Sequence, residues 1–380
     1  MNYAFASDNT AAICPEAFAA FAEANAGCAP SYGDDPWTAR ARALLREIFA
    51  TDCAVFFVFN GTAANALALA ALCQRHHGIL CHALSHVDTD ECGAPEFFTG
   101  GAKVIPLDAP AAKLRVGDLA PVLHRGHGVH YPKLRALSLT QSTELGTVYT
   151  VDELRELADF AHAHGWSVHV DGARFANALA AQNISAADAT WRAGVDVLCL
   201  GGTKNGLSTT EAVVFFNREL AREFEYRVKQ SGQLASKMRF AAAQWVGALR
   251  DGAWLRHAAH ANACARRLAD GLRPLAALRL LFEPAVNGVF VEMPPAVFDA
   301  LTARGWHFYK FIGEHGYRLM TSWATTEAEV DAFIADARAA TKKSGGSSTR
   351  PTQLPASLAP FTSRWPALGP VPPPERPRPA

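Results

Sequence analysis

Three short stretches of the sequence combine residue types that could hold and use an organic cofactor. Lys204 lies in the segment 202–206, where small neighbouring residues leave room for a bulky group on its amine nitrogen. That nitrogen is a potential nucleophile. Asp171 ends an apolar run and is followed by Gly172, so its carboxylate can face a protonated ring nitrogen. Asn60 ends another apolar run and precedes a helical pattern, whose first N–H groups suit a phosphate.

Together these stretches contain what pyridoxal phosphate requires. A lysine forms a Schiff base with the cofactor, a carboxylate keeps the pyridine nitrogen protonated so that the ring accepts electrons, and a helix N-terminus neutralises the phosphate. Each feature alone has a simpler explanation: Asp171 as a helix cap, Lys204 as a solvated loop residue, and Gly61 with Thr62 as a plain turn. Their occurrence in order at the ends of strands favours the cofactor site.

Alternating apolar runs and amphipathic stretches between about residues 55 and 217 must position these residues. The apolar runs predict strands, and residues 61–73 and 151–164 carry apolar side chains at helical spacing. Such alternation implies an α/β fold, a mainly parallel sheet with helices on both faces, and ligands in such sheets bind at the carboxyl ends of strands. The predicted strands cover residues 54–59, 78–81, 103–107, 135–140, 167–170, 195–200 and 212–216.

Longer helical patterns and two short apolar runs follow residue 217. This mixture is typical of a smaller α+β domain at the C-terminal side. The helical patterns cover residues 219–229, 235–272, 295–304 and 326–340, and the apolar runs cover residues 279–282 and 288–292.

These patterns divide the chain into four parts. We expect an N-terminal arm with an active-site segment over residues 1–40, a large cofactor-binding domain over 41–245 and a small domain over 246–341. Residues 342–380 are rich in Ser, Gly and Pro. Such a composition cannot bury enough apolar surface to offset the entropy of ordering, so a disordered tail is expected there.

The composition limits the kinds of partner. The 380 residues are 49% hydrophobic, and 36 basic side chains balance 36 acidic ones. Because no basic cluster stands out, a small-molecule substrate is expected rather than a nucleic acid or a membrane. No apolar stretch reaches the roughly 18 residues of a membrane helix, and no secretory signal is visible, so we expect a cytoplasmic protein. Eight scattered cysteines without a C-x-x-C pair are expected to be reduced thiols.

Over about residues 5–340 the sequence resembles the L-threonine aldolases of low specificity, which are pyridoxal phosphate enzymes of fold type I, similar to aspartate aminotransferase. The resemblance implies a mainly parallel seven-stranded sheet with helices on both faces and a smaller C-terminal α+β domain. It looks closest to a bacterial branch with Gly-Gly-Thr-Lys-Asn-Gly at the lysine, where many other aldolases have Ser-Lys-Gly. The matching motifs are residues 6–9, 32–35, 59–65, His86 with Glu91 and Gly93, 171–174, 202–206 and 318–321.

The resemblance implies roles in cofactor chemistry. Lys204 would be the Schiff-base lysine, Asp171 the partner of the pyridine nitrogen, and His86 the group that stacks on the ring. A base would take the β-hydroxyl proton as the Cα–Cβ bond breaks. That base would be His86, His130 or a water held by either, and a neutral imidazole at ordinary pH can serve. The phosphate would be held by Asn60, Gly61 and Thr62.

The resemblance also implies roles in substrate binding. Ser7, Arg174 and Arg318 would hold the substrate carboxylate, since a planar guanidinium matches a carboxylate in two parallel hydrogen bonds. Arg174 would lie against the cofactor as well. Further residues would approach the site, some of them from a neighbouring subunit: Tyr32 and His130 near the substrate, and Arg227 with Lys229 near the phosphate.

The expected function is reversible cleavage of L-threonine, L-allo-threonine and related β-hydroxy-α-amino acids to glycine and an aldehyde. Another pyridoxal phosphate enzyme on the same scaffold stays open: a transaldolase, a β-eliminating lyase or an aminotransferase. His86 favours the aldolase, because aminotransferases typically have Tyr, Phe or Trp there. A non-enzymatic member is the third alternative, against which the intact Lys204 and Asp171 argue. We expect a homodimer or homotetramer with active sites at the subunit interface.

No metal site is expected. His257 and His260 lie three residues apart in a helical pattern, but the sequence shows no matching acidic or thiolate cluster beside them. A structural or solvated role is therefore favoured for these histidines.

Overall fold

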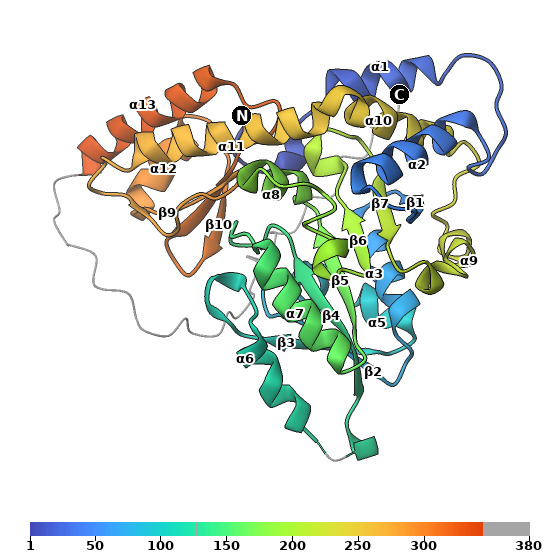
Figure 1. Ribbon diagram of the computed structural model, residues 1–380. Helices are drawn as coiled ribbons and strands as arrows, with labels where there is room; N and C mark the ends of the chain where they lie inside the picture. Colours follow the sequence, from blue (N-terminus) through green and yellow to red (C-terminus); the bar gives the residue numbers. More distant parts are fainter. Residues whose placement is uncertain (127, 345–380) are drawn as a thin grey trace, which may run out of the picture.

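A seven-stranded sheet forms the centre of the computed structural model, which describes residues 1–126 and 128–344 (Figure 1). The strand order is β1-β7-β6-β5-β4-β2-β3, and only β7 runs antiparallel to its neighbours. The mainly parallel sheet and all seven predicted strands are confirmed. The strands are β1 (Ala54–Val58), β2 (His77–His82), β3 (Lys103–Leu107), β4 (Lys133–Thr140), β5 (Ser167–Gly172), β6 (Val197–Leu200) and β7 (Glu211–Phe215).

The strands carry apolar side chains toward both faces of the sheet because helices cover both faces. In β7, Ala212 and Val214 pack in one core, whereas Val213 and Phe215 pack in another on the opposite face. The first core also contains residues of α2, α7, α8 and α10, and the second contains residues of α3 and α9. These helices are α2 (Pro36–Phe49), α3 (Gly61–Leu72), α7 (Val151–Ala163), α8 (Phe175–Gln182), α9 (Phe224–Gln230) and α10 (Arg239–Leu249).

A separate antiparallel sheet lies beside the large one, with strand order β10-β11-β9-β8 (Figure 1). Helices α11, α12 and α13 pack with it around a core that includes Leu268, Val291 and Phe333, and Phe5 of the N-terminal segment joins this core. The predicted runs 279–282 and 288–292 become β8 and β9, whereas the sequence pattern missed the hairpin of β10 and β11. The elements are β8 (Arg279–Leu280), β9 (Gly288–Glu292), β10 (Tyr309–Ile312), β11 (Gly316–Met320), α11 (Ala253–Leu272), α12 (Pro295–Ala303) and α13 (Glu327–Ser344).

Two predicted helices are wrong in their continuity. The pattern over 235–272 is divided by a turn at Arg250–Gly252, where Asp251 and Gly252 have φ values of 54° and 68°. Glycine adopts positive φ without a Cβ penalty, so the chain turns there although the helical periodicity continues. The pattern over 219–229 likewise divides into a short 3₁₀ helix, η7 (Arg218–Ala221), and α9.

The C-terminal helix α13 ends later than predicted. It runs to Ser344 and therefore includes Lys342, which the sequence pattern assigned to the tail. The rest of the predicted tail, residues 345–380, lies outside the described residues.

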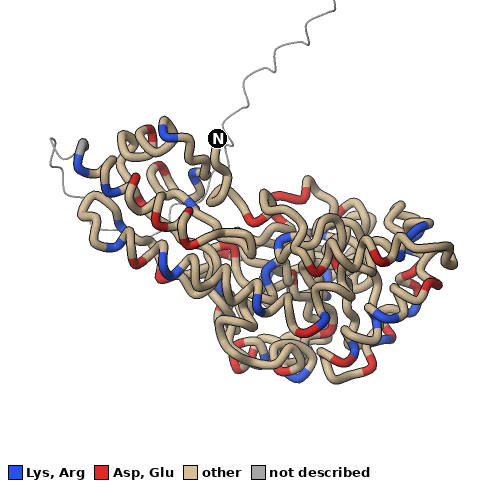
Figure 2. The backbone as a smooth tube through the Cα atoms, turned by 90° about the horizontal axis from the view of Figure 1, so that it is seen from above, with Lys and Arg blue, Asp and Glu red and all other residues tan. Residues whose placement is uncertain are grey.

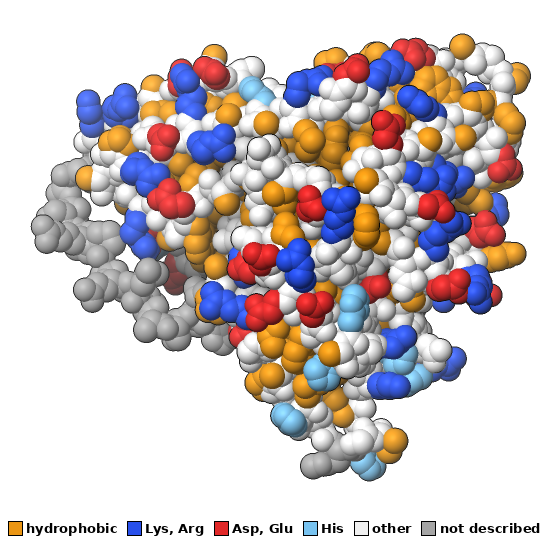
Figure 3. All heavy atoms as spheres, in the orientation of Figure 1, with side chains coloured by type: hydrophobic (Ala, Val, Ile, Leu, Met, Phe, Trp, Pro, Cys, Tyr) orange, Lys and Arg blue, Asp and Glu red, His pale blue; other side chains and the backbone are white. Residues whose placement is uncertain are grey.

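Basic and acidic side chains are interspersed along the backbone (Figure 2) and on the face shown in Figure 3. This distribution agrees with the equal numbers of the two charges in the sequence. Across 1–126 and 128–344, no helix is both long and apolar enough to cross a membrane.

Candidate active site

Lys204 and Asp171 lie at the carboxyl ends of neighbouring parallel strands. Asp171 is the fifth residue of β5 and pairs with Cys199 of β6, and Lys204 lies in the 3₁₀ turn η6 (Thr203–Asn205) after β6. The amine of Lys204 has no hydrogen bond or ion pair within the described residues. Glu211, buried at the start of β7, accepts a hydrogen bond from the Gly202 N–H and so holds the turn in place.

The small residues before Lys204 have a packing reason. A Cβ at Gly201 would lie 2.4 Å from the carbonyl oxygen of Ala173, and one at Gly202 would lie 2.4 Å from that of Thr210. Backbone contacts this close exclude any side chain. The sequence pattern suggested that small residues make room on the lysine nitrogen, but at these two positions they let the backbone of the turn approach its neighbours.

Four polar side chains form a hydrogen-bonded chain that starts at Asp171. Asn65 of α3 donates one amide hydrogen to Asp171 Oδ2 at 2.9 Å and the other to Glu91 Oε1 at 2.8 Å. Glu91 Oε1 also lies 2.9 Å from Nδ1 of His86, and Asp171 Oδ1 accepts from the N–H of Ala173 at 3.0 Å. Sequence reasoning missed Asn65 and gave Glu91 no role, although both belong to motifs of the resemblance.

This series of hydrogen bonds determines which nitrogen of His86 carries a hydrogen. Because Glu91 Oε1 is an acceptor, Nδ1 of His86 carries its hydrogen, and Nε2 is the atom left to exchange a proton. The hydrogen bond to Glu91 raises the pKa of His86, Asp171 adds to this, and burial and Lys204 oppose it. Burial raises the pKa of Glu91, opposed by its hydrogen bonds to His86 and Asn65. Nε2 of His86 also lies 3.3 Å from a carboxylate oxygen of Asp90.

Two partly buried arginines, Arg174 and Arg318, lie near Asp8. Arg174 binds the carboxylate of Asp8 through two hydrogen bonds of 2.7 and 2.9 Å. Burial raises the pKa of Asp8, but Arg174 outweighs this and holds it below its usual range. Burial and the charge of Arg174 lower the pKa of Arg318, whose buried Nε has no partner in the described part of the chain. Ser7 precedes Asp8 and lies 3.4 Å from its carboxylate. The structure thus brings together Ser7, Arg174 and Arg318.

Helix α3 begins with exposed N–H groups. Asn60 caps the helix by accepting from the Ala63 N–H at 2.8 Å. The N–H groups of Gly61 and Thr62, in the first turn, have no acceptor within the helix. A Cβ at Gly61 would meet no atom within 4 Å, so this end of the helix faces open space. Asn65, one turn further along α3, links the same helix to Asp171.

Three predicted residues do not join this group within one chain. His130 lies just before the amino end of β4, whereas Asp171 pairs with Thr140 at its carboxyl end. The 8 residues of β4 separate these ends by roughly 25 Å. Tyr32 is 50% exposed, and its ring faces Nζ of Lys229 at 4.6 Å. Arg227 lies on α9.

The residues that do come together fit pyridoxal phosphate. Buried atoms Asn65 Oδ1, Glu91 Oε2 and Arg318 Nε have no hydrogen-bond partner, which is unusual unless a ligand supplies one. Among the described residues, the unpaired amine of Lys204, the buried carboxylate of Asp171 and the N–H groups of Gly61 and Thr62 match the aldehyde, the pyridine nitrogen and the phosphate of this cofactor.

The chain is similar to known proteins both in sequence and in fold. Residues 4–295 match the family of beta-eliminating lyases. The low specificity L-threonine aldolase of Pseudomonas aeruginosa is 54% identical over 334 residues, which cover 88% of this chain and 96% of that protein.

Solved structures agree. A Leishmania major threonine aldolase superposes with a TM-score of 0.85 at 28% identity, covering 90% of this chain and all of the other. Serine palmitoyltransferase of Sphingomonas wittichii, at 17% identity and a TM-score of 0.66, covers 90% of this chain and 87% of its own and shares the fold. The architecture is that of the fold type I pyridoxal phosphate enzymes, and the chain belongs to the beta-eliminating lyase family, among the low-specificity L-threonine aldolases.

Proposed function

We propose that the protein is a pyridoxal phosphate-dependent lyase that reversibly cleaves L-threonine, L-allo-threonine and other L-β-hydroxy-α-amino acids to glycine and an aldehyde. The observation that carries this proposal is the 54% identity to a low specificity L-threonine aldolase over 96% of its length. The free amine of Lys204 beside the buried Asp171 supports it. No observation specifically favours a transaldolase, a β-eliminating lyase or an aminotransferase.

In this proposal the bound cofactor supplies an electron sink for the bond that breaks. Lys204 would hold its aldehyde carbon, Asp171 would pair with its pyridine nitrogen, and His86 would stack on its ring. Asn60, Gly61 and Thr62 would bind the phosphate at the start of α3, with Arg227 as a further contact. Asn65 and Glu91 orient Asp171 and His86 through the hydrogen bonds given above.

The substrate carboxylate is held by Ser7, Arg174 and Arg318. Since Arg174 is already paired with Asp8, Arg318 is the guanidinium with a charge still to be neutralised. The β-hydroxyl proton passes to Nε2 of His86, to His130 or to a water held by either, because Nδ1 of His86 is engaged with Glu91.

We propose further that the enzyme is a homodimer or homotetramer with active sites at the subunit interface. Tyr32, His130 and Arg227 would then act across that interface, which the half-exposed ring of Tyr32 and the exposed imidazole of His130 support. We also propose that residues 1–40 form an N-terminal arm, residues 41–245 the large cofactor-binding domain and residues 246–341 the small domain. A cytoplasmic location is proposed on the eight cysteines, all of them free thiols.

The test is product analysis with the purified holoenzyme. L-threonine, L-allo-threonine and their D-forms are each incubated without a second substrate, and glycine, acetaldehyde, 2-oxobutanoate and ammonia are measured. Equal amounts of glycine and acetaldehyde from the L-forms are expected. Production of 2-oxobutanoate and ammonia would instead identify β-elimination, and turnover that needs an added aldehyde or 2-oxo acid would identify a transaldolase or an aminotransferase.

The role of Lys204 is tested on the same protein. Borohydride should remove the visible absorption of the holoenzyme, and Lys204→Ala should abolish turnover. Lys103→Ala, which changes an exposed lysine at the start of β3, is the control and should behave like the parent. A colourless protein that cannot be reconstituted with pyridoxal phosphate would refute the proposal.

A further inference from the structure

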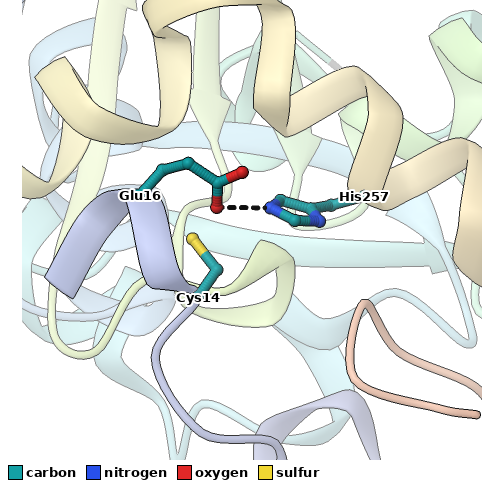
Figure 4. Close-up of side chains that lie close together, drawn as sticks. All are labelled: Cys14, Glu16 and His257. Carbon is teal, nitrogen blue, oxygen red and sulfur yellow. Dashed lines mark hydrogen bonds and ion pairs between the residues drawn. The ribbon is translucent and has the colours of Figure 1, made fainter. Parts of the chain in front are cut away.

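Cys14, Glu16 and His257 form a cluster outside the residues proposed for catalysis (Figure 4). The thiol sulfur, a carboxylate oxygen and an imidazole nitrogen all lie within 4.8 Å of one another. Glu16 belongs to α1 (Pro15–Glu23), which Cys14 immediately precedes, and His257 belongs to α11. The three side chains point toward one another in Figure 4, although 241 positions separate Glu16 from His257.

The carboxylate of Glu16 connects the other two groups. Its Oε2 lies 2.8 Å from Nε2 of His257, and its oxygen lies within 4.8 Å of the sulfur of Cys14. Burial and the negative charge of Glu16 raise the pKa of Cys14.

A thiolate, an imidazole and a carboxylate are ligands that Zn²⁺ prefers together. Mg²⁺ and Ca²⁺ favour oxygen ligands alone. Tetrahedral zinc bonds of about 2.0–2.3 Å place ligand atoms roughly 3.3–3.8 Å apart. The Glu16 and His257 ligand atoms, 2.8 Å apart, would separate and the Cys14 sulfur would approach them, each by about 1 Å or less. The fourth position would be left to water.

We propose that Cys14, Glu16 and His257 bind one Zn²⁺ ion. On binding, the sulfur–hydrogen bond of Cys14 breaks, a sulfur–zinc bond forms, and the proton leaves to solvent. The lone pair of His257 Nε2 and one oxygen of Glu16 complete the protein ligands, with the imidazole hydrogen then on Nδ1. No oxidation or reduction occurs.

The surroundings allow entry and give the site a structural effect. The side chains of Glu16 and His257 are 35% and 18% exposed, which leaves a path from solvent. Arg256 Nη2 lies 4.0 Å from the carboxylate, but its side chain is 59% exposed and can turn away. The N–H of Cys14 donates to the carbonyl of Gly206 at 2.7 Å. A bound ion would thus tie together α1, α11 and the turn that carries Lys204.

The experiment measures zinc binding directly. Holoenzyme is freed of metal with a chelator and dialysed against micromolar Zn²⁺, and bound zinc is counted per chain by elemental analysis. Co²⁺ serves as a spectroscopic probe, because its ligand-field bands lie at longer wavelength than the absorption of the cofactor. The variants are Cys14→Ser and His257→Gln, and Cys28→Ser, which removes an exposed cysteine outside the cluster, is the matched control.

The parent and Cys28→Ser are each expected to bind one zinc ion per chain and to show the tetrahedral cobalt bands. Both cluster variants should lose the zinc ion and these bands. Zinc should also raise the Tm of the parent but not of His257→Gln. The proposal is overturned if the parent retains no zinc, or if the cluster variants bind as much as Cys28→Ser. If Cys14→Ser fails to fold, His257→Gln alone tests the proposal, because His257 is a partly exposed side chain whose replacement should be compatible with folding.

Discussion

Arg318 is a partly buried residue whose charge lacks a complete set of partners. Its Nε is unpaired, and its guanidinium lies 4.4 Å from the centre of the Phe311 ring. At the same time the charge of Arg174 is already balanced by Asp8. An anionic substrate would supply the partner that Arg318 lacks, which explains why two arginines can lie so close together.

Replacing Arg318 by Lys tests this assignment. The ammonium keeps the charge but loses the two-pronged geometry, and a hydrogen bond to a charged group contributes about 1.5–3 kcal/mol. The KM for L-threonine should therefore rise roughly 10- to 100-fold, while the visible spectrum of the cofactor stays unchanged. Arg279→Lys, changed in an ion pair with Glu292 on the small sheet, is the control. An unaltered KM in Arg318→Lys would remove Arg318 from the carboxylate site.

Replacing Glu91 by Gln tests the protonation of His86. The hydrogen bond to Glu91 raises the pKa of His86, and Asp171, Asp90 and Lys204 are the other charged groups near the ring. If the neutral imidazole of His86 takes the β-hydroxyl proton, the parent loses activity as the pH falls through this raised pKa. Glu91→Gln removes the main cause, so the acid limb of kcat/KM should move to lower pH.

Two controls separate this effect from a loss of structure. Asp90→Asn, at a side chain that is 56% exposed, should move the limb less. Cofactor content should be equal in all the proteins compared. The sign also holds for stability: the ion pair of His86 stabilises the protein below the ordinary histidine pKa, and this contribution is lost as the pH rises through the raised pKa. An acid limb unchanged in Glu91→Gln would contradict the assignment.

At the scale of elements, Gly247 allows α1 and α10 to pack with their backbones in contact. A Cβ at this position would lie 2.1 Å from the carbonyl oxygen of Glu16 and 2.9 Å from Cβ of Ala20. The backbone of α1 cannot give way as a flexible side chain would, so the helices must separate. The same contact supports the segment that carries Cys14 and Glu16.

Gly247→Ala should therefore destabilise the protein by about 2–3 kcal/mol, the upper range for an overpacked core. Thermal unfolding of the holoenzyme measures the loss. Gly117→Ala is the matched control, since a Cβ there meets no atom within 4 Å and φ is not positive. It should be neutral or slightly stabilising. Equal Tm values for the two variants would show that α1 moves freely relative to α10.

At the scale of the whole molecule, α13 is the last element of the described residues and packs in the core of the small sheet. Val330 and Phe333 of this helix are fully buried in the core of the small sheet. The helix continues to Ser344, so a cut at Lys342 would remove part of an element. Residues 345–380, by their Ser, Gly and Pro content, contribute little apolar surface.

Deleting residues 345–380 should leave cofactor content, Tm and turnover as in the full chain. A longer deletion that starts at Glu327 should abolish soluble protein, because it exposes the core that Val330 and Phe333 fill. Measuring soluble yield and cofactor absorbance of both proteins checks the prediction. Loss of soluble protein in the shorter deletion would show that the C-terminal residues support the fold.

Most elements could be predicted from the sequence because their signal is local. Seven apolar runs correspond to seven strands, and Lys204, Asp171 and Asn60 were expected at the ends of strands and lie there. Periodicity and turn residues act within a few positions, so a single sequence reports them. The same signal failed where apolar periodicity continues through a turn, as at Asp251 and Gly252.

Only the tertiary structure decided which side chains meet. Asn65 reaches Asp171 across 106 positions, Asp8 reaches Arg174 across 166, and Glu16 reaches His257 across 241. Only the tertiary structure likewise showed that β7 runs antiparallel to its neighbours, because the apolar pattern of a strand is the same in either direction. Contacts of this sort depend on how distant strand ends and helix starts are brought to one edge of the sheet. That placement is determined by the packing of the whole chain, which no local pattern contains.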